Sequence, residues 1–166
     1  MLVALLGLSL ASCGFHLRGN IPLSDGIKNL SVTAPNGPFS DKLAKRLVSL
    51  GANLVESEGA DAFLNVSSVT SNRDVGTLDE RGKVNSYDVK LVVQYVLQDA
   101  AGQAIRPQAT IWESRRYNFD PDTVIESESE EADLIEDMED SAVLKLIRRL
   151  ASITDFDPSK VKRITK

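Results

Sequence analysis

The sequence predicts an α+β domain of two layers, in which two amphipathic helices pack on one face of a mainly antiparallel four-stranded sheet. From Tyr87 to Leu97 every odd position is apolar or aromatic, which is typical of a half-buried antiparallel strand. Residues 41–50 and 128–152 instead carry apolar side chains at helical spacing. The predicted order is a strand, a helix, a three-stranded meander and a second helix. Both helices can then cover the single apolar face of the sheet.

The chain begins with an uncharged apolar run that ends at Leu10-Ala11-Ser12-Cys13. Residues 1–12 are too short to span a membrane, which takes ~20 residues, but they match the apolar core of a secretory signal. The small residues before Cys13 fit a bacterial lipobox, in which the cysteine thiol accepts the lipid. We therefore expect a lipoprotein signal peptide at 1–12, a lipidated Cys13 and a folded domain at 13–153. The alternative is an ordinary buried cysteine.

Residues 27–33 predict the first strand, which the turn-forming residues 34–38 end. A helix then follows, for which Ser40 is the expected N-cap and Gly51 the expected left-handed C-terminal cap. Its predicted buried stripe consists of Leu43, Ala44, Leu47 and Val48.

Residues 52–58 are compatible with a short strand, and the β pattern becomes strong from Phe63 toward Val75. Residues 80–83 predict a hairpin tip, because Gly82 can adopt a positive φ angle. After the strand at 87–97 the chain turns at 99–103 and enters a last strand that ends near Phe119. Pro107 in this strand lacks a backbone donor, which indicates a sheet edge or a bulge.

The final helix is expected at 128–152, with an apolar stripe formed by Ile135, Met138, Ala142, Leu146 and Leu150. Eleven acidic side chains and no basic ones lie between residues 120 and 140. The rest of the chain has 19 basic and 13 acidic side chains and is mildly basic. The acidic block is either a solvated helix start that suits the helix dipole or a contact site for a basic partner. Residues 154–166 are predicted to form a basic flexible tail.

The sequence shows no constellation of residues that would perform catalysis. It lacks a nucleophile elbow, a P-loop, a zinc-protease motif and a calcium loop. Cys13 is the only cysteine and His16 the only histidine, which excludes an intramolecular disulfide and leaves almost nothing for a transition metal. We expect no enzyme, no cofactor and no metal. Export makes nucleic acid an unsuitable partner, and a hydrolase that uses carboxylates is disfavoured.

Four stretches together resemble the LPS-assembly lipoprotein LptE family. They are Cys13-Gly14-Phe15-His16-Leu17-Arg18-Gly19, Asn36-Gly37-Pro38, Tyr87 after a glycine hairpin, and the segment 146–153 at the end of the last helix. The resemblance implies a domain with two helices and four strands, anchored to the periplasmic leaflet of the outer membrane. It also implies a partner, the LptD β-barrel, whose lumen the lipoprotein plugs while lipopolysaccharide is inserted into the outer leaflet. No catalysis is implied.

Lipopolysaccharide carries phosphates, which Arg and Lys bind through charge-assisted hydrogen bonds. The expected phosphate contacts are Arg81 and Lys83 near the hairpin tip and Arg73 on the adjoining strand. The alternative is that these are solvated charges that discourage edge pairing. The acidic residues at 126–131 leave open whether a second phosphate contact exists there. A different function also stays open, that of an envelope lipoprotein acting as a binding adaptor for peptidoglycan or a transporter.

Overall fold

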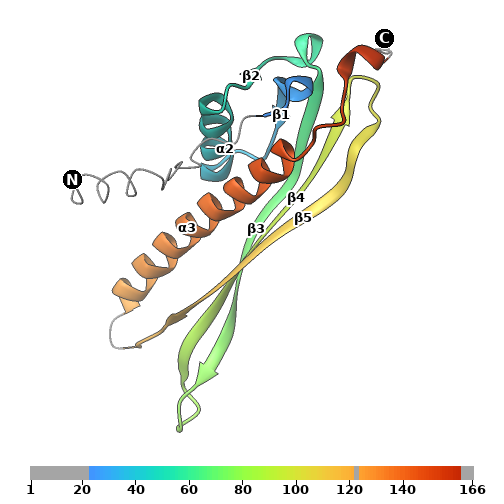
Figure 1. The fold of residues 1–166 in the computed structure, drawn as a ribbon. Helices are drawn as coiled ribbons and strands as arrows, with labels where there is room; N and C mark the ends of the chain where they lie inside the picture. The colour runs from blue at the N-terminus through green and yellow to red at the C-terminus, as the bar shows by residue number, and fades with distance from the viewer. Residues whose placement is uncertain (1–22, 122–123, 162–166) are drawn as a thin grey trace, which may run out of the picture.

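The computed structural model describes residues 23–121 and 124–161. Its centre is a five-stranded sheet in the order β2-β1-β3-β4-β5, against which the two long helices lie on one side (Figure 1). The strands are β1 (Asn29–Thr33), β2 (Asn53–Leu54), β3 (Ala62–Leu78), β4 (Val84–Asp99) and β5 (Ala104–Asn118). The helices are α2 (Pro38–Ser49) and α3 (Val124–Ala151), with short 3-10 turns η2 (Asp25–Ile27), η3 (Ser57–Gly59) and η4 (Pro158–Lys160).

The predicted two-layer α+β class is correct, but the four-stranded, mainly antiparallel sheet is wrong in its strand number and pairing. The β3–β4 and β4–β5 pairs are antiparallel, whereas β1 runs parallel to both of its neighbours, β2 and β3. Helix α2 carries the chain back so that β2 enters the sheet in the same direction as β1. The short strand that residues 52–58 were compatible with is present as β2, but only two residues long. A strand this short shows too little alternation to indicate its pairing in the sheet.

Helix α2 begins earlier than predicted, because Pro38 and not Ser40 opens it. Gly37 occupies the N-cap position, and the Ser40 hydroxyl donates to the Gly37 carbonyl at 2.8 Å from within the first turn. Proline is favoured there because its fixed φ angle suits the helix and the first turn needs no donor. The predicted C-terminal cap is confirmed: Gly51 has a φ of 87° and donates to Val48, while Ala52 donates to Leu47.

The core lies between the helices and the helix-facing side chains of the three long strands. The odd positions of β4 from Val89 to Leu97 are buried, as predicted. Met138, Ala142, Leu146 and Leu150 of α3 are also buried, while Ile135 is only partly so. The stripe predicted for α2 is wrong at Val48, which is 56% exposed, since Phe39, Leu43 and Leu47 at intervals of four form the buried face.

The β3–β4 hairpin is longer than the sequence predicted, and its closed end extends past the start of α3 (Figure 1). Strand β5 stops short of this end and forms one edge of the sheet. Pro107 therefore lies on an edge strand, as expected, in a segment where the register shifts between Tyr95 and Leu97. The projecting hairpin end is the part of the fold that carries the candidate site.

Part of the segment after α3 contacts the domain. Asp155 pairs with Arg106 of β5 at 2.9 Å, and Phe156 is partly buried beside Gly26, where a side chain would collide with the Phe156 carbonyl. Residues 162–166 lie outside the described residues. Among the helices described, none combines the length and the apolar character that crossing a membrane requires.

One charged contact is built into the helix–sheet interface. Glu113 of β5 is 4% exposed at its side chain, and its Oε1 lies 2.6 Å from the Lys145 ammonium of α3. Arg115 approaches the other oxygen of Glu113 at 3.7 Å. A buried carboxylate without a partner is costly, so this ion pair fixes how α3 lies along β5.

We predict that Lys145→Met lowers the free energy of unfolding by about 2 kcal/mol, because it leaves the buried Glu113 with a weaker partner. Chemical denaturation measures this. The double variant Glu113→Gln with Lys145→Met should regain most of the loss, and Lys45→Met on the exposed side of α2 should change little. A double variant as unstable as Lys145→Met alone would contradict the role given to the ion pair.

Candidate functional site

The hairpin end is closed by a turn that Asp79 organises. Its carboxylate accepts hydrogen bonds from the backbone N–H groups of Arg81 and Lys83 at 2.8 and 2.9 Å, and from the Arg81 guanidinium at 3.2 Å. Gly82 adopts a φ of 78°, as predicted. These contacts, above all the bond from the Lys83 backbone, lower the pKa of Asp79 from its usual 3.8. The turn is thus held in one shape, and it fixes where the two cationic side chains begin.

The turn between β4 and β5 repeats this construction. Asp99 accepts from the backbone N–H groups of Ala101 and Gln103 at 2.8 and 2.9 Å, and Gly102 has a φ of 76°. Both turns share the pattern Asp-x-x-Gly, in which an aspartate side chain caps the turn and a glycine supplies the positive φ. The two turns differ in charge, since only the one at the hairpin end carries Arg and Lys.

An aromatic and charged cluster lies between this turn and helix α3. The Arg73 guanidinium sits 4.5 Å from the centre of the Tyr87 ring. Tyr87 in turn contacts Tyr117 and Phe119, with ring centres 5.8 and 5.1 Å apart. Arg73 comes from β3, Tyr87 from β4 and Tyr117 from β5, and Phe119 directly follows β5. The cluster therefore connects the three long strands.

Glu131 of α3 completes the cluster. One of its oxygens accepts from Arg73 Nη1 at 2.6 Å and from the Tyr117 hydroxyl at 2.7 Å. Burial, and next the bond to Glu131, raises the pKa of Tyr117 above its usual 10.0. Glu131 is thus one contact that holds the first half of the helix on the sheet, together with the partly buried Leu134 and Ile135.

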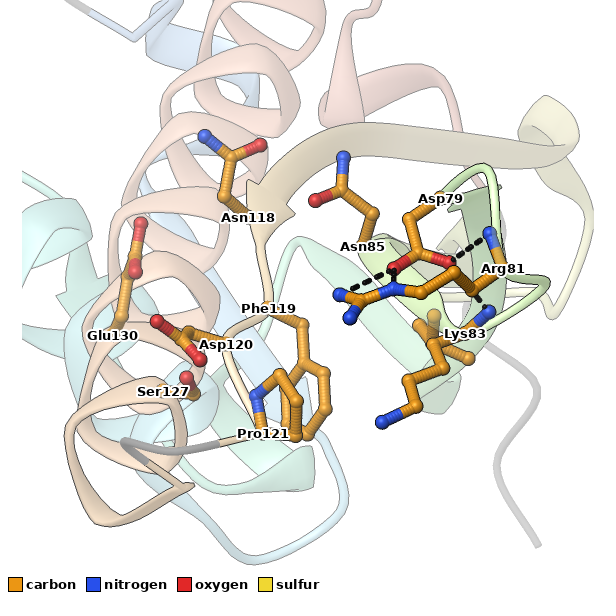
Figure 2. A pocket seen from close by; sticks show the side chains of 11 residues that line it. Asp79, Arg81, Lys83, Asn85, Asn118, Phe119, Asp120, Pro121, Ser127 and Glu130 are labelled. Carbon is orange, nitrogen blue, oxygen red and sulfur yellow. Dashed lines mark hydrogen bonds and ion pairs between the residues drawn. The ribbon is translucent and has the colours of Figure 1, made fainter.

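A hollow of about 700 Å³ opens next to this cluster (Figure 2). Arg81 and Lys83 line it from the hairpin, and Asp120 and Glu130 from the opposite side. Its other lining residues are Asp79, Val84, Asn85, Asn118, Phe119, Pro121 and Ser127. The size is that of a small-molecule site, and the lining is polar with charges of both signs.

The structure brings together two of the residues predicted to bind phosphate and separates the third. Arg81 and Lys83 both line the hollow, whereas Arg73 lies outside its lining and is engaged by Glu131. Arg81 is paired with Asp79 on its own turn, while Lys83 forms no ion pair among the described residues. Cys13, the expected lipidation site, lies outside the described residues.

The acidic residues of α3 were not recognised as part of this site, and the structure gives several of them partners within the chain. Glu130 lines the hollow and Glu131 binds Arg73. Farther along the helix, Lys42 of α2 lies 3.3 to 3.6 Å from oxygens of Glu136, Glu139 and Asp140. The local sequence offers no signal for these pairings, because each partner is distant along the chain.

The charges of both signs that line the hollow suit the binding of a charged ligand. Across the residues that the structure describes, no three His, Cys, Asp or Glu side chains converge as metal ligands would. The hollow contains cations, carboxylates, amides and an apolar base formed by Phe119 and Pro121. Such groups recognise a charged ligand by pairing with it.

Comparison with known proteins finds a matching family and two similar named proteins. Residues 27–150 match the model of the family LptE, described as lipopolysaccharide-assembly. The chain is 25% identical over 170 residues to the LPS-assembly lipoprotein LptE of Photorhabdus laumondii, covering 98% of this chain and 91% of that one. It is 26% identical over 149 residues to the protein of the same name from Pectobacterium atrosepticum, covering 86% and 79%.

A solved structure has the same fold. It is the solution structure of uncharacterized lipoprotein B from Nitrosomonas europaea, with a TM-score of 0.71 and 23% identity. The match covers 92% of this chain and 99% of that chain. The overall fold described above is therefore shared with that protein.

We predict that Glu131→Gln loosens the first half of α3, because a neutral amide binds Arg73 more weakly than a carboxylate does. The expected loss is about 1 kcal/mol, given that Arg73 is partly exposed. Hydrogen exchange should show faster exchange of α3 amides near residue 131 and little change near residue 146. Glu128→Gln, an exposed change one turn away, is the control, and equal effects of the two variants would contradict the assignment.

A second prediction concerns pH at the turn. Because the pKa of Asp79 is lowered in the folded chain, its carboxylate stabilises the turn above pH 3.8, and this is lost as the pH falls through the lowered pKa. NMR should show the amides of Arg81 and Lys83 losing their hydrogen-bonded shifts in this acidic range. In Asp79→Asn the two amides should lack that transition, and its persistence there would rule Asp79 out as the cause.

Proposed function

The chain belongs to the LptE family of lipopolysaccharide-assembly lipoproteins, and on that premise we propose that it plugs and supports the LptD β-barrel during lipopolysaccharide transport to the cell surface. The family role in lipopolysaccharide assembly is not enzymatic, which agrees with a site built for binding. The proposal adds to this role a barrel partner and a contact with lipopolysaccharide phosphates.

The proposal includes the anchor. Residues 1–12 act as the signal peptide, Cys13 carries the lipid, and the domain at 13–153 stands at the periplasmic face of the outer membrane. Nine residues separate Cys13 from Leu23, where the described structure begins. Nine residues reach at most roughly 30 Å, so a lipid on Cys13 would keep the domain within that distance of the membrane surface.

The free face of the sheet supports the barrel-plug role. A barrel lumen is polar, so a domain that fills it needs a polar surface. The face of the sheet opposite the helices carries ion pairs between neighbouring strands, Asp88 with Arg116 at 2.7 Å and Lys90 with Asp74 at 2.8 Å. Charged pairs of this kind keep the face soluble before assembly and present both signs of charge to a polar wall.

The observation that carries the lipopolysaccharide contact is the hollow at the hairpin end, where Lys83 and Arg81 stand on the same wall. Phosphate oxygens bind strongly to ammonium and guanidinium donors. Lys83 contributes most to phosphate binding, because its ammonium forms no ion pair within the described chain. The Arg81 guanidinium, in contrast, already pairs with Asp79. Arg73 stays part of the proposal: Glu131 engages its Nη1, so a phosphate would bind the remaining guanidinium donors of this 45% exposed side chain.

Co-purification tests the barrel partnership. Detergent extraction of the full-length tagged chain should recover a Cys13-lipidated protein in complex with LptD, identified by mass spectrometry of both components. Recovery of the chain only as a free monomer would contradict the barrel-plug role. Retention by peptidoglycan in place of LptD would favour the adaptor function instead.

Charge reversal tests the lipopolysaccharide contact. We predict that Arg81→Glu with Lys83→Glu weakens binding to lipopolysaccharide roughly tenfold at low salt, since each exposed pair contributes up to ~1 kcal/mol. The difference should shrink as salt is raised, because salt screens exposed charges. Lys45→Glu with Arg46→Glu on the exposed side of α2 reverses the same number of charges and is the matched control. Unchanged affinity at low ionic strength would remove the hairpin end from the binding surface.

A further inference from the structure

We propose that the hollow at the hairpin end selects a phosphate ester that also carries a primary ammonium group. This inference rests on the proposed phosphate contact and narrows its chemistry. The phosphate would bind the cationic wall and the ammonium would bind the acidic wall across the hollow. A ligand with phosphate alone would satisfy only half of the site.

The two walls come from different parts of the fold and differ in sign. Figure 2 shows Arg81 and Lys83 on the hairpin side, with Glu130 and Asp120 on the side of α3 and Phe119 and Pro121 between them. Glu130 belongs to α3. The next residue in the chain, Glu131, links this part of the helix to the sheet through Arg73 and Tyr117. The separation of charge is therefore built into the packing of the helix on the sheet.

Within the described part of the chain, Lys83 on one wall and Glu130 on the other do not form an ion pair. Arg81 binds Asp79 on its own turn at 3.2 Å, and among the described residues neither Lys83 nor Glu130 forms an ion pair. Elsewhere in the chain, cations and carboxylates that face each other do pair, as Lys42 does with α3. Here the intervening hollow of about 700 Å³ keeps them apart.

Electrostatics then determines which ligand fits. A plain phosphate is attracted by Lys83 and repelled by the carboxylates on the opposite wall. An ammonium on the same ligand converts that repulsion into attraction, and charge-assisted hydrogen bonds form on both sides. The amides of Asn85 and Asn118 also line the hollow and can bond the ester and its neighbouring oxygens.

The experiment compares O-phosphoethanolamine with ethyl phosphate, which has a similar size but no amine. Both are titrated at pH 8, where each phosphate is doubly charged, into the lipidated full chain in detergent, and amide shifts near Lys83 and Asn118 are followed by NMR. We expect O-phosphoethanolamine to bind roughly threefold to fivefold more tightly. Glu130→Gln should remove that preference while leaving ethyl phosphate bound at least as well as before.

Two control variants distinguish ligand selection in the hollow from a general effect of the protein's net charge. Glu128→Gln changes the same charge on α3 outside the lining and should keep the preference. Lys83→Gln should weaken both probes, since both use the phosphate contact.

Three outcomes would overturn the inference. Equal affinity for the two probes would do so while leaving the proposed lipopolysaccharide contact intact. A preference that disappears when Mg²⁺ is added, because ethyl phosphate then binds equally well, would show that the acidic wall holds a bridging cation. Binding of neither probe would overturn both the inference and the phosphate contact, but not the LptD partnership, which co-purification tests separately.

Discussion

The architecture of the hairpin end depends on one carboxylate, that of Glu131. It receives hydrogen bonds from Arg73 of β3 and from Tyr117 of β5, and so fixes the first half of a 28-residue helix to the far end of the sheet. Without this contact the polar start of α3 has few apolar side chains to hold it, since the fully buried stripe begins at Met138. The hollow between helix and hairpin lies next to this junction, and Glu130 in its lining is the neighbour of Glu131 in the chain.

Several carboxylates of the acidic block at residues 120–140 therefore form ion pairs that help to hold the fold together. Glu131 and the group around Glu139 bind basic side chains of β3 and α2, while Glu130 is left facing the hollow. For Glu131, Glu136, Glu139 and Asp140, basic partners lie in the same chain. A contact of the other acidic residues with a separate basic partner stays a prediction.

Several features of the fold that depend on a local residue pattern were predicted correctly from the sequence. The alternation in β4, the stripe of α3, the hairpin at Gly82 and the cap at Gly51 all follow from backbone geometry. The parallel pairing of β1 and the 58-residue separation between Arg73 and Glu131 have no local signature, so they were missed. The repeated Asp-x-x-Gly pattern was a usable signal, since it marks both hairpin turns.

The central claim is that the hairpin end of this lipoprotein binds lipopolysaccharide. Photo-crosslinking in living cells tests it most directly, with a photoreactive amino acid placed at position 85 in the lining of the hollow, which leaves Lys83 in place, or, for comparison, at position 45 on α2. The account predicts a lipopolysaccharide adduct from position 85 and none from position 45. An adduct from position 45 alone would contradict it.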